Sequence, residues 1–333
     1  GWHTSAAIGI DHLGCLLMAT QYWVGATSGD VSAAANWNNG ASITNDDKII
    51  FDSAAQGDVL SGTLAGPRGV AVAIGPGFSQ SIGTSGTQIP LQLKGGDVAI
   101  YMQDGFANIS LATSKCVIAQ APLGDQLFLD GEMDDVNVTS AKGRITFGSS
   151  TDIANLIVAP VPGKSGDRPE IKIEAGGDVD NIYLMGPCYV ENNVGTAKLI
   201  VSHPSAEYIQ KDGNLAGTMV VVAGGTVRVE TEVFVSDDPL LIHNGKYIVE
   251  PSCRLFSFAS DTDVQLFSGG LFSTEWVPSE SMAGTITSYG GRWDTRKPGT
   301  VTIPGDTKLS STSGRSLNFQ LAANSGHVPT VLW

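Results

Sequence analysis

A short cassette recurs along this chain and limits the folds that it can adopt. Each copy consists of an apolar strand, a glycine-centred turn and a second short strand, as in VVVAGGTVRVE at 220–230 and VQLFSGGLFSTE at 264–275. The second glycine of the turn, or its equivalent, stands at Gly96, Gly131, Gly177, Gly225, Gly245, Gly270 and Gly291. The last four glycines follow one another at similar, short intervals, which are interpreted as single periods. The intervals from Gly131 to Gly177 and from Gly177 to Gly225 are about twice as long and are interpreted as double periods.

A period of about 20 to 25 residues is typical of one coil of a β-solenoid, in which each coil supplies two or three short strands and stacks on the next. Glycine suits the corners of such a coil, because the chain turns there with positive φ and little room for a side chain. The sequence therefore predicts an all-β, single-stranded β-solenoid (a right-handed parallel β-helix). Its expected corner glycines are Gly96, Gly177, Gly225, Gly270 and Gly291.

Composition and local pattern agree with an all-β fold. Glycine makes up 41 of 333 residues and charged residues only 16%, against roughly 25% in an average protein. Short runs alternate apolar and polar residues and end at Gly, Asn, Asp or Pro, which indicates strands. Examples are 48–52, 97–102, 126–130, 143–148, 170–174, 197–202, 218–223 and 226–230. A β-sandwich is the alternative, because its strands also recur with turns between them, although it does not require one cassette to repeat.

The same patterns divide the chain. Residues 1–17 are expected to be a leader or N-terminal extension, because Met18 opens a typical start. They are not expected to be an export signal, because such a signal begins with basic residues and no Lys or Arg precedes Lys48. Residues 18–60 are expected to form an N-terminal capping coil, 61–305 the solenoid, and 306–333 a C-terminal cap or oligomer contact. Two segments, 162–170 and 277–285, are expected to be inserted loops.

Charge and ligand spacing exclude several functions. With 19 Lys and Arg against 33 Asp and Glu, the net charge is −14 and the basic residues are scattered, so we expect no nucleic-acid binding. No apolar run approaches the roughly 18 residues of a membrane span, so no membrane insertion is expected. Cys15, Cys116, Cys188 and Cys253 form no C-x-x-C pair and are expected to be buried thiols. No metal and no cofactor is predicted.

Residues 22–56 carry a resemblance to a known family. They contain W-x-G, G-D, N-W, a polar turn and an apolar strand ending in F-D, at Trp23–Gly25, Gly29-Asp30, Asn36-Trp37, Asn45–Asp47 and Ile49–Asp52. In this order the motifs resemble the opening coil of single-stranded right-handed β-helix proteins of bacteriophage virions, and they are similar to repeats of bacterial autotransporter adhesins. Trp23, Trp37 and Phe51 are expected to cover the open end of the solenoid core, which otherwise exposes apolar surface and strand edges.

The resemblance implies a structural protein at the surface of a virion. It implies a homo-oligomer, trimeric as phage β-helix proteins commonly are, whose partners are copies of itself and the major capsid protein or tail proteins. We expect a capsid decoration or cement protein. Two alternatives stay open: a tail fibre or tailspike that binds host surface glycan, and a bacterial surface adhesin passenger.

Right-handed β-helices also include polysaccharide lyases and hydrolases, so paired carboxylates need to be weighed. They occur at Asp46-Asp47, Asp134-Asp135, Asp237-Asp238, and at Asp261 with Asp263. Adjacent carboxylates in a strand point to opposite faces, so such a pair needs help from a neighbouring coil to act as acid and base. No histidine is flanked by glycine on both sides, and no hydrolase or nucleotide motif is present. We therefore predict no catalytic residue and no enzymatic activity.

Three aromatic residues near the C-terminal coils are candidates for contact with a ligand or another subunit. Trp276, Tyr289 and Trp293 lie close together in the sequence, and exposed rings of this kind can stack on sugars. A C-terminal cap is the alternative role for them.

Overall fold

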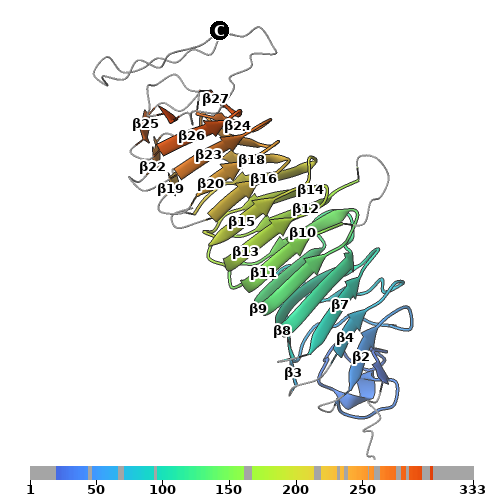
Figure 1. The fold of residues 1–333 in the computed structure, drawn as a ribbon. Helices are drawn as coiled ribbons and strands as arrows, with labels where there is room; N and C mark the ends of the chain where they lie inside the picture. The colour runs from blue at the N-terminus through green and yellow to red at the C-terminus, as the bar shows by residue number, and fades with distance from the viewer. Residues whose placement is uncertain are drawn as a thin grey trace, which may run out of the picture.

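The structure is a computed structural model that describes residues 20–43, 47–66, 71–93, 96–160, 167–213, 219–230, 233–235, 239–253, 255–258, 263–274, 279–282, 285–294 and 301–302. These residues form an elongated stack of short strands that runs from the N-terminal coil to the C-terminal end (Figure 1). The neighbouring named strands pair in parallel throughout. The predicted all-β solenoid is confirmed, and the β-sandwich alternative is wrong, because a sandwich pairs its strands antiparallel.

Two long sheets run along the stack, and a short third sheet is added in the C-terminal coils. Sheet 1 contains β1 (Thr20–Tyr22), β2 (Lys48–Phe51), β4 (Ala71–Ile74), β7 (Asp97–Tyr101), the second halves of β8 (Phe106–Gln120) and β9 (Leu127–Val138), β11 (Asp152–Val158), β13 (Asp178–Leu184), β15 (Lys198–Val201), β17 (Met219–Val222), β20 (Leu240–Ile242), β23 (Asp263–Phe267), β26 (Thr285–Tyr289) and β28 (Val301–Thr302). Sheet 2 contains β3 (Leu64–Gly66), β5 (Ser81–Ile82), β6 (Ile89–Leu93), the first halves of β8 and β9, β10 (Gly143–Phe147), β12 (Pro169–Ile173), β14 (Cys188–Asn192), β16 (Ala206–Gln210), β18 (Thr226–Val229), β21 (Lys246–Val249), β24 (Leu271–Ser273) and β27 (Arg292–Asp294).

Sheet 3 is short and lies in the C-terminal coils. It contains β19 (Val233–Val235), β22 (Leu255–Phe258) and β25 (Ser279–Met282). The described residues contain a single helix, the 3-10 turn η1 (Ala34–Asn36) in the first coil. The expectation that 277–285 is an inserted loop is wrong, because β25 occupies part of it and extends sheet 3. Of the other expected loop, residues 161–166 lie outside the described residues, as do 1–17 and 306–333.

The core consists of inward-facing aliphatic side chains stacked in columns. In sheet 1, Ile182, Leu199, Val220, Leu240 and Val264 lie opposite one another in successive strands and are at most 1% exposed. Each such side chain contributes about 1.5 to 3 kcal/mol on burial. Because every coil covers the apolar side chains of the coil beneath it, the whole stack shares one continuous core.

The eight segments proposed as strands from their alternation all contain strands of the structure. The period is less regular than the cassette indicates. Asn181 pairs with Lys198 across a short coil, whereas Thr20 pairs with Lys48 across a much longer one. Coil length therefore varies in the connections, while the strands keep their register.

The cassettes do not all mark the same corner, which corrects one interpretation of the sequence. Gly225, Gly270 and Gly291 lie where sheet 1 passes to sheet 2, whereas Gly96 and Gly177 lie where sheet 2 passes to sheet 1. The interval from Gly177 to Gly225 is therefore longer than two coils. Two coils lead from the start of β13 to the start of β17, and β17 itself then leads to the other corner, where Gly225 lies. In the cassette at 127–138 the corner lies within one strand, because β9 passes from sheet 2 to sheet 1 at Gly131, whose φ is 93°.

We expected one glycine of each turn to have both a positive φ and no room for a side chain. In several cassettes, one glycine of the turn has the positive φ and the next glycine lacks the room. Positive φ falls on the first position at Gly176, Gly269 and Gly290, whereas at Gly270 a Cβ atom would lie 2.5 Å from the Ile242 carbonyl oxygen of the previous coil. Gly225 meets both constraints, since its φ is 73° and a Cβ would lie 2.5 Å from the Ala206 oxygen.

We expect Gly225→Ala to lower the free energy of unfolding by about 2 to 4 kcal/mol, because it adds backbone strain and a steric overlap with the previous coil. Gly124 has φ of 78° and open space around a Cβ, so Gly124→Ala should cost about 1 kcal/mol. Gly86→Ala, with neither constraint, should be nearly neutral. Urea titration followed by circular dichroism measures all three, and equal losses at 124 and 225 would contradict the steric account.

Candidate functional site

The first coil is closed by an aromatic cluster. Trp23, Trp37 and Phe51 are 0%, 3% and 0% exposed, and their ring centroids lie 5.3 to 6.1 Å apart. The Trp23 indole N–H donates to the Gly57 carbonyl, and the Trp37 indole N–H donates to the Val31 carbonyl. The structure thus brings together the three residues that the sequence singles out as capping residues, at the N-terminal end of the core.

Asn36 of the N-W motif organises the loop over this cluster. Its side chain is fully buried, and its Oδ1 accepts from the Thr27 N–H, the Thr27 hydroxyl and the Ser28 N–H at 2.8 to 3.1 Å. Its Nδ2 donates to the Ser28 hydroxyl and to the Asp30 carbonyl. The pKa of the Asp30 carboxyl is lowered, because it accepts from the Ser32 hydroxyl and N–H.

We expect Asn36→Ala to destabilise the first coil by about 2 to 4 kcal/mol, because it leaves the part-buried Thr27 N–H, Ser28 N–H and Asp30 carbonyl without their partner. Asn39→Ala is the matched control, since Asn39 is exposed and its side chain accepts from the Ala41 N–H two residues away. Hydrogen exchange read by mass spectrometry should show faster exchange over residues 20–60 in the first variant alone. Unchanged exchange there would show that the amide network does not hold the cap.

The outward face of sheet 2 carries a network of ion pairs between coils. Arg144 contacts Asp125 at 2.9 Å and Glu170 at 2.8 Å, and Arg228 contacts Glu207 at 3.1 Å and Glu250 at 2.5 Å. The pKa of Arg144 is raised by its hydrogen bonds to Asp125 and Glu170, and that of Arg228 by its bond to Glu250. Half-exposed pairs contribute at most about 1 kcal/mol each, so the network mainly satisfies the charges of this face.

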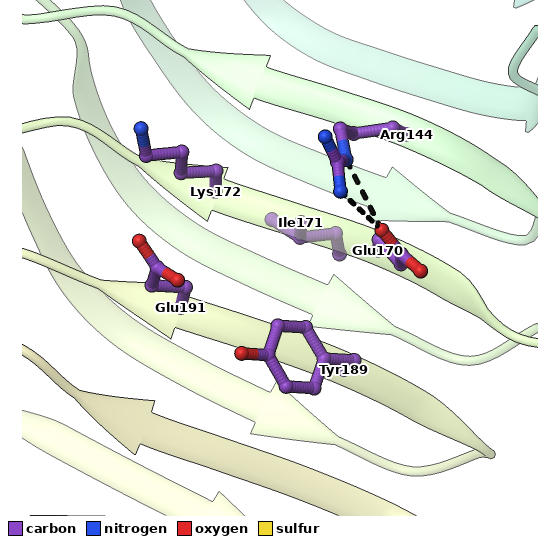
Figure 2. A pocket seen from close by; sticks show the side chains of 6 residues that line it. All are labelled: Arg144, Glu170, Ile171, Lys172, Tyr189 and Glu191. Atoms are coloured by element: carbon purple, nitrogen blue, oxygen red, sulfur yellow. Dashed lines mark hydrogen bonds and ion pairs between the residues drawn. The ribbon is translucent and has the colours of Figure 1, made fainter. Parts of the chain in front are cut away.

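A shallow depression of about 200 Å³ lies within this network (Figure 2). It is lined by Arg144, Glu170, Ile171, Lys172, Tyr189 and Glu191, which come from three neighbouring strands, β10, β12 and β14. Glu170 is held by Arg144, and Lys172 donates to Glu174, which raises the pKa of Lys172. The depression is smaller than the roughly 300 Å³ of typical ligand pockets, and these two charged groups already have partners.

A second hollow of about 400 Å³ lies at the connections before β8 and β9. It is lined by Ser81, Gln103, Asp104, Gly105, Phe106, Pro122, Leu123 and Gln126. Leu123 is 67% exposed, and the Phe106 ring packs on Phe128 at 5.6 Å. An aromatic ring beside amide and carboxylate groups suits a polar ligand with apolar C–H faces, such as a sugar.

The carboxylate pairs take structural positions. Asp134 and Asp135 are both exposed, so the expectation that adjacent carboxylates point to opposite faces is wrong here, because the strand is irregular between Met133 and Asp135. Asp135 accepts from the Asn155 amide at 2.9 Å, and Asn155 accepts in turn from Asn181. Asp263 accepts from Gln265 in its own strand. Asp46, Asp237, Asp238 and Asp261 lie outside the described residues.

The C-terminal aromatic residues separate into different environments. Trp293 packs against the core, and its ring stacks on buried Phe272 at 6.5 Å. Tyr289 is 43% exposed and stacks on Phe267 at 5.0 Å with nearly parallel rings. One face of each ring of this outer stack is therefore occupied by its neighbour. Trp276 lies outside the described residues.

The sequence also predicts buried thiols, no metal site and no membrane insertion. Cys116, Cys188 and Cys253 are buried as expected, and burial raises the pKa of the first two to about 12. Within the described ranges, no group of three or more His, Cys, Asp or Glu side chains is arranged to hold a metal ion. None of the helices in that part of the chain has the length and apolar character that crossing a membrane needs.

Searches of protein-family models, curated proteins and solved structures find no match to this chain. The resemblance to phage virion β-helices, which is inferred from the motifs within residues 22–56, therefore stays a prediction.

Proposed function

We propose that this chain is a structural, non-enzymatic protein of a phage virion, and specifically a capsid decoration protein. The observation that carries the proposal is the unbroken parallel stacking of coils under a closed N-terminal cap. Such a stack is a stiff rod, because each coil is held by a ladder of backbone hydrogen bonds and a shared core. A stiff rod with long lateral faces suits attachment to a particle surface, and the motifs at 22–56 give the phage setting.

The paired charges of sheet 2 support a structural role. Groups that bind or transform a substrate need free donors, acceptors or bases, whereas Arg144, Glu170, Arg228 and Glu207 are already engaged with one another across coils. The face that they form resists pairing with other strands and stays hydrated, as the surface of an exposed particle protein requires.

Quantitative mass spectrometry of purified virions from a culture that makes this chain tests the proposal. A decoration protein should be present at hundreds of copies, in a fixed ratio to the major capsid protein. A few to a few tens of copies would instead indicate a tail fibre or spike. Absence from washed particles would overturn the virion role and favour the adhesin alternative.

The hollow beside Phe106 supports a second candidate function, the binding of a surface glycan. An exposed apolar group at Leu123, an aromatic ring at Phe106 and the polar side chains of Gln103 and Asp104 converge there. Sugars are held by this combination of ring stacking and hydrogen bonds.

We expect the full chain to bind members of an array of bacterial surface polysaccharides, and Asp104→Ala to weaken that binding at least tenfold. Tyr189→Ala, in the depression of sheet 2, is the control and should bind as the wild type does. Loss of binding in both variants, or no binding by the wild type, would contradict glycan recognition in this hollow.

A further inference from the structure

One outward column of sheet 1 carries no charged residue along the whole stack. Its members are in register from strand to strand and come from thirteen strands: Tyr22, Ile50, Ala73, Ala99, Val117, Asn137, Ile157, Tyr183, Ile200, Val221, Leu241, Gln265 and Thr287. We call this set the neutral column. Its central part, from Ile157 to Leu241, is apolar or aromatic in every strand, and these side chains are half-buried.

The neutral column differs sharply from the outward columns of sheet 2. There, the register that begins at Arg144 continues through Glu170, Tyr189 and Glu207, so charges recur from coil to coil. The chain carries a net charge of −14, yet none of its charged residues stands in the neutral column. Solubility of a monomer does not require an uncharged line over the full length of one face, so the line points to a contact.

We propose that copies of this chain associate side by side along the neutral column, with their solenoid axes parallel and pointing the same way. The proposal rests on the structural function proposed above. In a closed assembly around an axis parallel to the solenoid, each residue near the axis meets its own counterpart in the next copy. A charged residue there would face an identical charge at close range, and this repulsion opposes association. Neutrality at every height is what such an assembly requires.

The dimensions also fit a second copy. At about 4.8 Å per strand, a column through thirteen strands is on the order of 60 Å long, and three adjacent outward columns are about 14 Å wide. The resulting area, about 850 Å² per copy, reaches the roughly 800 Å² per partner of stable protein interfaces. A straight partner of this length with the same strand spacing is another copy of the chain itself.

The flanks of the column are compatible with this arrangement. On the side where the central strands end, Ala159, Met185, Ser202, Ala223 and His243 continue the backbone ladder and carry no formal charge when the histidine is neutral. When copies are related by rotation about an axis parallel to the solenoid, the uncharged flank of one copy faces the other flank of the next copy. That other flank, on the side where the strands begin, has charged residues that include Lys198 and Asp263. Lys198 of that flank therefore meets no like charge along the central coils.

Sedimentation velocity of the full chain tests the proposal with a matched pair of variants. Leu241 and Ile248 are half-buried, outward-facing aliphatic residues of β20 and β21 in the same coil, but only Leu241 belongs to the neutral column. We expect a wild-type oligomer, a rise in dissociation constant on the order of 100-fold for Leu241→Lys, and no comparable rise for Ile248→Lys. A monomeric wild type, or the same response in both variants, would overturn the proposal.

Cross-linking tests the direction of packing and remains informative if Leu241→Lys unfolds. In a Cys15→Ala background, Val117→Cys and Leu241→Cys should each give disulfide-linked copies on mild oxidation, because both meet their own counterpart only when the axes point the same way. Ile248→Cys should remain uncross-linked. Cross-linking at neither column position would sink the parallel arrangement. An oligomer found in solution but missing from virions would sink the virion role while leaving this interface in place.

Discussion

Parallel stacking in register is the constraint on which the rest of this structure depends. A parallel ladder places each residue directly above its counterpart in the previous coil, so the choice of an inward residue is tied to the residues above and below it. Inward positions such as Leu199 and Val220 must therefore be apolar and of similar size. The connections escape this requirement, which is why coils differ in length along the chain while the columns stay aligned.

Much of the fold follows from the sequence because alternation and glycine report directly on strands and turns. The strand segments and the aromatic cap could be predicted from such signals. The two corners could not be separated, since a glycine-rich turn between apolar strands has the same pattern whichever sheet comes first. Sheet 3 was missed as well, because the Ser-Glu-Ser-Met sequence of β25 lacks the apolar alternation that identifies a strand.

The surface features were harder to predict for a different reason. Alternation indicates which residues point outward, but only the register indicates which outward residues stand above one another. Members of the neutral column follow one another at unequal spacings, since the step from Ile157 to Tyr183 is clearly longer than the step from Tyr183 to Ile200. No fixed period in the sequence reveals such a column. Asn36 was within reach, since the N-W motif marks it, but its role as the centre of a hydrogen-bond network depends on how residues 27–30 fold over it.

In a solenoid the core fixes the inward positions, so functional differences have to be carried by the outward ones. The two large faces of this chain use that freedom in opposite ways. Sheet 2 pairs charges across coils, as Arg228 does with Glu207 and Glu250, and this makes a hydrated surface that is poorly suited to burial because paired ions would have to lose their water. Sheet 1 keeps charged residues out of its central column, and the nearby Lys198 ammonium lies over the Tyr183 ring of that column. In the assembly that we propose, this difference between the faces directs contact toward sheet 1 and leaves sheet 2 in contact with solvent.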